Sequence, residues 1–179
     1  MRIGLLRHFP VQQPFPTGWP TAGELETWLD QYDVAAVTIG AADLAGVSWQ
    51  VCLASDLPRA RTTAQTLFPG EREHTPLLRE IRFTPFRTGN LRLPMWAWWW
   101  LLRFAWMSRH PSQRACRQDI AQRVQNMADR LCAAEQDTLV VSHAGLMAFL
   151  SAELRRRGFT GPKLRLADHA RCYVYEKTI

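Results

Sequence analysis

Two histidines and two arginines follow short apolar runs in this sequence: Arg7 and His8 after 3–6, Arg59 after 51–54, and His143 after 138–142. Short apolar runs that alternate with helical patterns are typical of strands in a parallel sheet. In such sheets the ligand crevice lies at the carboxyl ends of the strands. The four side chains are therefore expected to meet in one crevice, and this combination of cations and imidazoles indicates a phosphate site.

Each of these side chains could supply something that phosphoryl transfer requires. The reaction needs a nucleophile in line with the leaving oxygen, and cations on the equatorial oxygens. A neutral His8 imidazole can attack phosphorus and form a phosphohistidine that water then hydrolyses. Arg7 and Arg59 would bind the phosphate oxygens, and their charges would help to keep His8 neutral. A protonated His143 would add a third charge-assisted donor.

Two further positions complete the predicted site. Glu80 would protonate the departing alkoxide as a general acid and later activate water as a base. Glu71 and Glu73 lie nearby in the sequence, so the choice of acid stays open at this point. Ala144 and Gly145 have almost no side chain, so backbone N–H groups at the start of a helix could approach the phosphate there.

Four pieces of sequence carry a resemblance to a known family: Leu5-Leu6-Arg7-His8, residues 55–64, Leu78-Arg79-Glu80, and residues 140–145. In order and spacing they resemble the histidine phosphatase superfamily, which also contains the cofactor-dependent phosphoglycerate mutases. The resemblance covers nearly the whole chain and points to the compact bacterial-type phosphatases. It implies a phosphohistidine at His8 and supports the roles given above to the other site residues.

The sequence also departs from the family pattern. Phe9 stands where the family usually has glycine, and we expect it to alter the local turn and to place a ring at the pocket wall. Residues 10–14 lack the Thr/Glu and Asn positions that help mutases and many phosphatases to bind phosphate. Ala144 replaces a more usual glycine. These differences leave the substrate open and keep a non-catalytic phosphate-binding module as an alternative.

Composition sets modest bounds on the class of protein. The chain has 179 residues, which is enough for one domain with a core. Its net charge of +6 comes almost wholly from arginine, because only Lys163 and Lys177 are lysines. The charges are scattered, so we expect no nucleic-acid partner. The three remaining histidines, His74, His110 and His169, have no spacing typical of a metal site, and no cofactor is predicted.

Cysteine usage and hydropathy indicate a reducing compartment. The four cysteines include no CxxC pair, and we expect reduced thiols and a cytoplasmic protein. The chain opens directly on a strand pattern, without the features of a signal peptide. The most apolar stretch, residues 93–107, is too short to span a membrane and contains Arg103.

Local patterns place the predicted elements along the chain. Strands are expected over 1–8, 50–54, 74–78 and 138–142, weakly over 33–39, and as one or two segments within 164–176. Helices are expected over 21–31, 58–68, from 111 onward, and over 144–157. Residues 9–20 are rich in proline and form a loop. These elements predict an α/β fold, a three-layer α/β/α sandwich of the phosphoglycerate mutase type, as a single domain over 1–179.

An aromatic-rich insert at about 91–110 holds five of the eight tryptophans. On a helix, Trp96, Trp99, Trp100 and Arg103 would share one face, and Trp98, Leu102 and Trp106 another. Three interpretations stay open for the segment from Trp96 to Trp106. It could pack as core over the sheet edge, form a lid whose rings receive an apolar or planar leaving group, or serve as a homodimer contact or membrane-surface patch.

The function predicted from the sequence is metal-independent hydrolysis of a phosphomonoester through a phosphohistidine at His8. The substrate would be a phosphorylated small molecule or a phosphoprotein. Alternatives are a phosphohistidine-protein phosphatase, a phosphotransferase of the mutase type, and the non-catalytic binding module.

Overall fold

A five-stranded sheet forms the centre of the protein in the computed structural model, which describes residues 1–84, 86 and 88–177. The strands are β1 (Arg2–Arg7), β2 (Val51–Ser55), β3 (Arg72–Thr75), β4 (Thr138–Ser142) and β5 (Cys172–Glu176). Their order across the sheet is β3-β2-β4-β1-β5, and only the pairing of β5 with β1 is antiparallel. The carboxyl ends of β1, β2 and β4 therefore lie side by side, as the sequence predicted.

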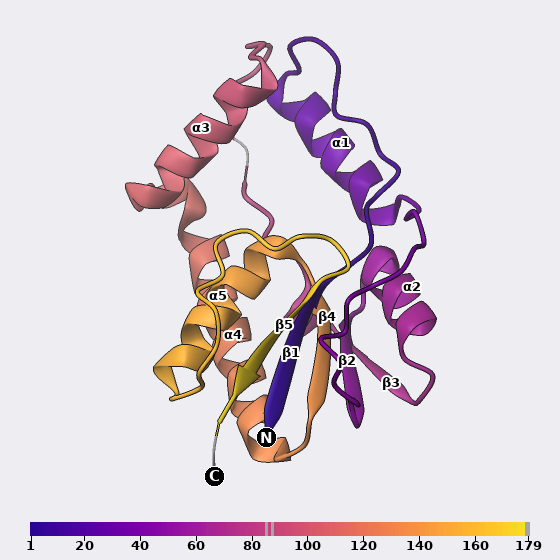
Figure 1. The fold of residues 1–179 in the computed structure, drawn as a ribbon. Helices are drawn as coiled ribbons and strands as arrows, with labels where there is room; N and C mark the ends of the chain where they lie inside the picture. The colour runs from indigo at the N-terminus through magenta and orange to yellow at the C-terminus, as the bar shows by residue number, and fades with distance from the viewer. Residues whose placement is uncertain (85, 87, 178–179) are drawn as a thin grey trace.

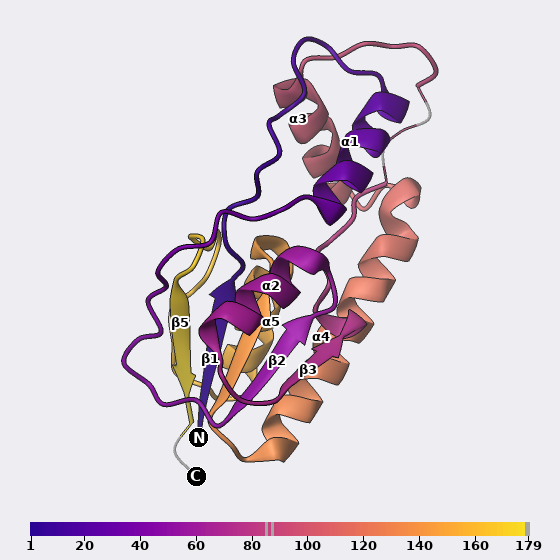
Figure 2. The ribbon, with the colours of Figure 1, turned by 90° about the vertical axis from the view of Figure 1, so that its right-hand side faces the viewer.

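Helices cover both faces of this sheet (Figures 1 and 2). The helices are α1 (Ala22–Val34), α2 (Pro58–Leu67), α3 (Met95–Met107), α4 (Arg114–Ala134) and α5 (Ala144–Arg156). Helices α4 and α5 pack with one face of the sheet in the larger core, and α2 packs with the other face. This confirms the predicted α/β sandwich.

Successive side chains of a strand point to opposite faces of the sheet, which explains the two cores. In β1, Ile3 and Leu5 contribute to the core under α4 and α5, whereas Leu6 contributes to the core under α2. Gly4 leaves room on the second face for the ring of Trp49, because a Cβ there would lie 2.5 Å from Trp49 Cζ2. The connection before β2 thus covers the sheet at the point where β1 has no side chain.

Helices α1 and α3, together called the cap here, pack on each other beyond the carboxyl ends of the strands (Figure 2). Trp98 and Leu102 of α3 are buried against Ala22, Leu25 and Trp28 of α1. Trp98 Nε1 also donates a 2.9 Å hydrogen bond to the carbonyl of Pro20. The insert therefore forms a core with α1 through Trp98 and Leu102, whereas Trp106 near its end packs against the larger core beside Phe149 of α5.

The facial division predicted for the insert is confirmed. Trp98 and Leu102 are buried and Trp106 is half-buried, whereas Trp96, Trp99, Trp100 and Arg103 are exposed. Among the described residues, no helix has both the length and the apolar character needed to cross a membrane.

Two boundary predictions were wrong. The weak strand at 33–39 is absent, because α1 continues to Val34 and only Val37 forms an isolated bridge, with Val11. The strand expected at 74–78 is β3 (Arg72–Thr75) followed by a 3-10 turn, since Pro76 has no N–H to donate to a neighbouring strand. Within 164–176 the structure has one regular strand, β5, in agreement with the one or two segments predicted there.

Candidate active site

His8 follows β1 directly and is almost fully buried. Its Nδ1 lies 2.6 Å from the carbonyl oxygen of Phe9. A carbonyl oxygen can only accept, so Nδ1 carries the proton and Nε2 presents a lone pair. Burial lowers the pKa of His8 to about 3, and the nearby charges of Arg59 and Arg7 act in the same direction. The imidazole is therefore neutral, with Nε2 available as a nucleophile.

His143 follows β4 and is fully buried, with its ring centroid 5.0 Å from that of His8. Arg59 Nε donates to His143 Nδ1 over 3.2 Å, and His143 Nε2 lies 2.9 Å from Ser55 Oγ. A guanidinium can only donate, so Nδ1 accepts and the ring proton sits on Nε2. Burial and then the charge of Arg59 lower the pKa of His143 well below its usual range. In this arrangement His143 orients Arg59 through the hydrogen bond at Nδ1. Its predicted role as a positively charged donor would require both ring nitrogens to be protonated.

Arg59, in the first turn of α2, is 1% exposed and is held from three sides. Besides its bond to His143, its Nη1 donates to the carbonyls of Tyr32 and Asp33, at 3.4 and 3.3 Å. The same nitrogen lies 2.9 Å from Asp33 Oδ1. Helix α1 has no basic residue in its own last turn, so Arg59 satisfies the carbonyls that a helix end leaves free.

Arg7, the last residue of β1, reaches the same region. Its Nη1 donates a 2.8 Å hydrogen bond to the carbonyl of Ala167. Its Nε is buried and has no hydrogen-bond partner within the part of the chain that the structure describes. The charge of Arg7 contributes to the lowered pKa of both His8 and His143, after burial and Arg59. The cation thus lies close to both imidazoles, as the strand-end argument predicted.

Glu80 binds the start of helix α5. Its Oε1 accepts from the backbone N–H groups of Ile81 and Leu146, at 2.8 and 3.2 Å, and its Oε2 accepts from Gly145 at 3.3 Å. A carboxylate is stabilised there by the helix dipole and by the free N–H groups. Gly145 permits the approach, because a Cβ on it would lie 2.6 Å from Glu80 Oε1.

The anion at this helix start is therefore a side chain of the protein itself. The sequence predicted that the N–H groups after His143, at Ala144 and Gly145, would approach phosphate. In the structure the Gly145 group serves Glu80. Of the other acidic candidates, Glu73 forms an ion pair with Arg130 of α4. Glu71 is exposed, so of the three candidates only Glu80 contacts the helix that follows His143 within the described part of the chain.

Two neighbours of the site were not predicted. His169 Nδ1 donates to the carbonyl of His8 over 2.8 Å, and the two rings meet edge to face at 5.2 Å. The sequence analysis gave His169 no place in the site, and no local pattern signals the bridge between its backbone and Arg7. Asp33 was not predicted, because it was assigned to a weak strand at 33–39 and not to the last turn of α1.

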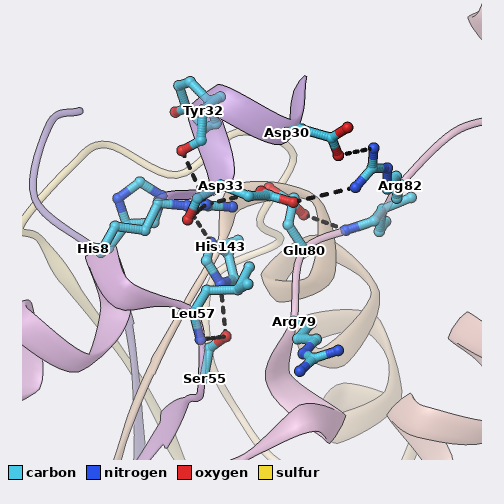
Figure 3. Close-up of polar contacts among 12 residues, drawn as sticks. His8, Asp30, Tyr32, Asp33, Ser55, Leu57, Arg79, Glu80, Arg82 and His143 are labelled. Atoms are coloured by element: carbon cyan, nitrogen blue, oxygen red, sulfur yellow. Dashed lines mark hydrogen bonds and ion pairs between the residues drawn. The ribbon is translucent and has the colours of Figure 1, made fainter. Parts of the chain in front are cut away.

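Figure 3 shows how the labelled side chains converge from separate segments: His8 after β1, Tyr32 and Asp33 from α1, Glu80 before the cap insert, and His143 after β4. Asp33 also faces Arg82, whose Nη1 is 3.6 Å from Asp33 Oδ2. The described residues include no cluster of three or more His, Cys, Asp or Glu side chains that could hold a metal ion. The site is thus a group of cations and neutral imidazoles, with two carboxylates engaged by protein donors.

Residues 17–177 match the model of the histidine phosphatase superfamily (branch 1). The match begins after Arg7 and His8, so the structure alone places those two residues in the site. A search of curated proteins returned no match.

Several solved structures are similar in fold. Mycobacterial hydrolase 1 is 18% identical, with 97% of this chain and 87% of that chain covered and a TM-score of 0.53. A mycobacterial glucosyl-3-phosphoglycerate phosphatase is 20% identical, with 87% and 79% covered and a TM-score of 0.50. The alpha-ribazole phosphatase from Shigella flexneri is 23% identical, with 86% and 79% covered and a TM-score of 0.48.

Proposed function

The chain belongs to the histidine phosphatase superfamily. We propose that it is a phosphatase that hydrolyses a phosphomonoester through a covalent phosphohistidine at His8, without a metal ion. The observation that carries this proposal is the state of His8. Its Nδ1 is committed to the Phe9 carbonyl, and its pKa of about 3 leaves Nε2 unprotonated at neutral pH. A nucleophile needs such a free lone pair at a fixed position.

Arg7 and Arg59 would bind the transferred phosphoryl group. Arg7 Nε is a buried donor without a protein partner among the described residues, and a phosphate oxygen would satisfy it. Arg59 is held rigidly by His143 and by the end of α1, which fixes the direction of its remaining donors. Fixed cations around the phosphoryl oxygens favour the transition state because they need no reorganisation during the reaction.

Glu80 would move the protons. Glu80 enters the first step protonated, because the negative charge of a bound phosphate ester disfavours a second anion beside it. His8 Nε2 then bonds to phosphorus as the ester P–O bond breaks, and the departing alkoxide takes this proton from Glu80. In the second step water attacks the phosphohistidine, Glu80 accepts the proton of that water, and inorganic phosphate leaves with His8 restored. The hydrogen bonds from Leu146 and Gly145 keep the carboxyl group at a constant position through both steps.

The experiment is a rapid-quench assay with p-nitrophenyl phosphate in excess chelator. We expect turnover and an acid-labile, base-stable phosphoenzyme in the wild type, and neither in His8→Asn. Turnover without trapped phosphate on histidine would contradict the proposed intermediate. Binding of inorganic phosphate without any turnover would identify the non-catalytic module.

Glu80→Gln tests the acid, with Glu73→Gln as the matched control because that carboxylate pairs with Arg130. Loss of the acid should lower kcat by about 10²–10⁴-fold for an alkyl phosphate. The effect on the phosphorylation step should be smaller with nitrophenolate, which leaves without a proton. An equal loss with both leaving groups would contradict the acid role.

A further inference from the structure

The outer face of α3 is an exposed aromatic stripe in which five large apolar side chains are 48–70% exposed: Trp96, Trp99, Trp100, Phe104 and Met107. Their spacing of three and four residues places them along one side of the helix. Figure 1 shows α3 along the outer edge of the cap, with α1 on its other side. The stripe is therefore separate from the packing that holds the cap together, which uses Trp98 and Leu102.

The sequence around the stripe is basic and contains no acid. Between Glu80 and Asp119 no aspartate or glutamate occurs, whereas arginine occurs seven times: 82, 87, 92, 103, 109, 114 and 117. Arg103, Arg109 and Arg114 are exposed and form no ion pair within the described part of the chain. The positive charge of Arg103 within α3, and of Arg109 and Arg114 after it in the chain, is thus available to an external anion.

The acidic side chains of the cap belong to α1. Three of them form ion pairs with arginines of the same chain: Glu24 with Arg92, Asp30 with Arg82, and Asp33 with Arg59. The cap therefore has one acidic helix, largely neutralised, and one helix that is aromatic and basic. This polarity favours a negatively charged partner on the α3 side.

We propose that the exposed face of α3 docks the protein onto the surface of an anionic lipid bilayer. Tryptophan rings are amphipathic and are favoured at the level of the lipid head groups. A helix with aromatic residues on one face, and arginines that extend toward anionic head groups, lies in the plane of the interface. Helix α3 has 13 residues, so it lies on the surface and does not span the bilayer.

A second copy of the chain is a poorer occupant of this face. A two-fold contact would place the same patch of each copy against the other. It would therefore bring Arg103 and Arg109 of one chain close to those of its mate, with no acid on α3 to compensate. Like charges at an interface oppose association. The proposal does not depend on the phosphohistidine chemistry.

Vesicle sedimentation tests the docking surface. Purified protein is mixed with phosphatidylcholine vesicles, or with vesicles that also contain phosphatidylglycerol, at low and high salt. We expect binding to the anionic vesicles, weaker binding to the neutral ones, and release at high salt. Arg103→Gln should lower the partition coefficient about fivefold, and Trp96→Ser with Trp100→Ser about tenfold or more.

Matched controls lie elsewhere on the surface. Ile39→Ser removes an exposed apolar side chain outside the cap helices, and Arg155→Gln removes an exposed arginine from the last turn of α5. Both controls should bind vesicles like the wild type, and all variants should keep wild-type hydrolysis of p-nitrophenyl phosphate. No binding of the wild type to anionic vesicles would overturn the proposal. Equal losses in the controls would also overturn it, as would a fall from dimer to monomer in the α3 variants without any vesicle binding.

Discussion

Acidification should destabilise the protein through His8, and the size of the effect follows from its environment. The imidazole has an ordinary pKa of 6.5 when unfolded and a pKa of about 3 in the folded protein, because of burial first and then of Arg59. Between these two values the unfolded chain binds a proton that the folded chain does not. The stability associated with neutral His8 is therefore fully present above pH 6.5 and is lost as the pH falls toward 3.

At pH 5 this loss can be worked out. The pH is then about 1.5 units below the unfolded pKa, and each unit corresponds to about 1.4 kcal/mol, so His8 should cost about 2 kcal/mol of unfolding free energy. The assay is urea unfolding followed by tryptophan fluorescence at pH 7 and pH 5, for the wild type and for His8→Asn. Carboxyl groups titrate in both proteins, so the difference between the two pH dependences isolates His8.

The wild type should lose about 2 kcal/mol more than His8→Asn over this pH interval. His143, whose pKa is also lowered by burial, adds a loss of the same sign to both proteins. An identical pH dependence in wild type and variant would refute the reasoning. It would mean that His8 reaches solvent and is protonated in the folded state.

Three further predictions concern the supports of the site. Gly145→Ala should lower kcat about 100-fold or more, because its Cβ would lie 2.6 Å from Glu80 Oε1 and would displace the carboxyl group; an unchanged kcat would contradict the role of Glu80. Asp33→Asn should tighten inhibition by inorganic phosphate about fivefold, since it removes a negative charge 2.9 Å from Arg59 Nη1; weaker inhibition would show that the carboxylate mainly holds Arg59 in place. Trp98→Ala should lower the unfolding free energy of the cap core by about 3–5 kcal/mol, whereas the same change at an exposed tryptophan of α3 should cost less than about 0.5 kcal/mol; calorimetry or urea unfolding distinguishes the two.

The site could be predicted where local sequence determines position. Arg7 is the last residue of a buried strand, His8 and His143 each follow such a strand directly, and Arg59 lies in the first turn of a helix that follows another. The neighbouring order of β1, β2 and β4 then brings the four together. A strand end and a helix start are local properties, so the motifs sufficed to place these residues.

Contacts between segments that lie far apart in the sequence could not be predicted from local patterns. The amphipathic pattern of α3 predicted which face would be buried, but not that α1, some 70 residues earlier, would cover it. Asp33 and His169 reach the site through long-range packing, and their immediate neighbours in the sequence give no sign of it. The helix start after His143 was predicted to approach phosphate, and local sequence could not show that Glu80 would accept hydrogen bonds from its N–H groups.

The structure explains how phenylalanine is accommodated where the family usually has glycine. The contacts at Phe9 that concern His8 are made by its backbone: the carbonyl accepts from His8 Nδ1, and the N–H donates to Thr63 Oγ1 over 3.0 Å. Thr63 in turn donates to the carbonyl of Arg59, which ties this backbone to helix α2. Phe9 does not have a positive φ, so no conformation reserved for glycine is required.

The ring of Phe9 is 1% exposed and therefore packs inside the protein, not at the wall of an open pocket. Any side chain that fits this buried space leaves the hydrogen bond to His8 in place. The substitution that had kept a non-catalytic module as an alternative thus leaves the tautomer of His8 unchanged. For the same reason, Phe9→Gly should impair folding through the lost packing while the surviving folded enzyme keeps its phosphoenzyme, and loss of the phosphoenzyme in folded Phe9→Gly protein would show that the ring itself positions His8.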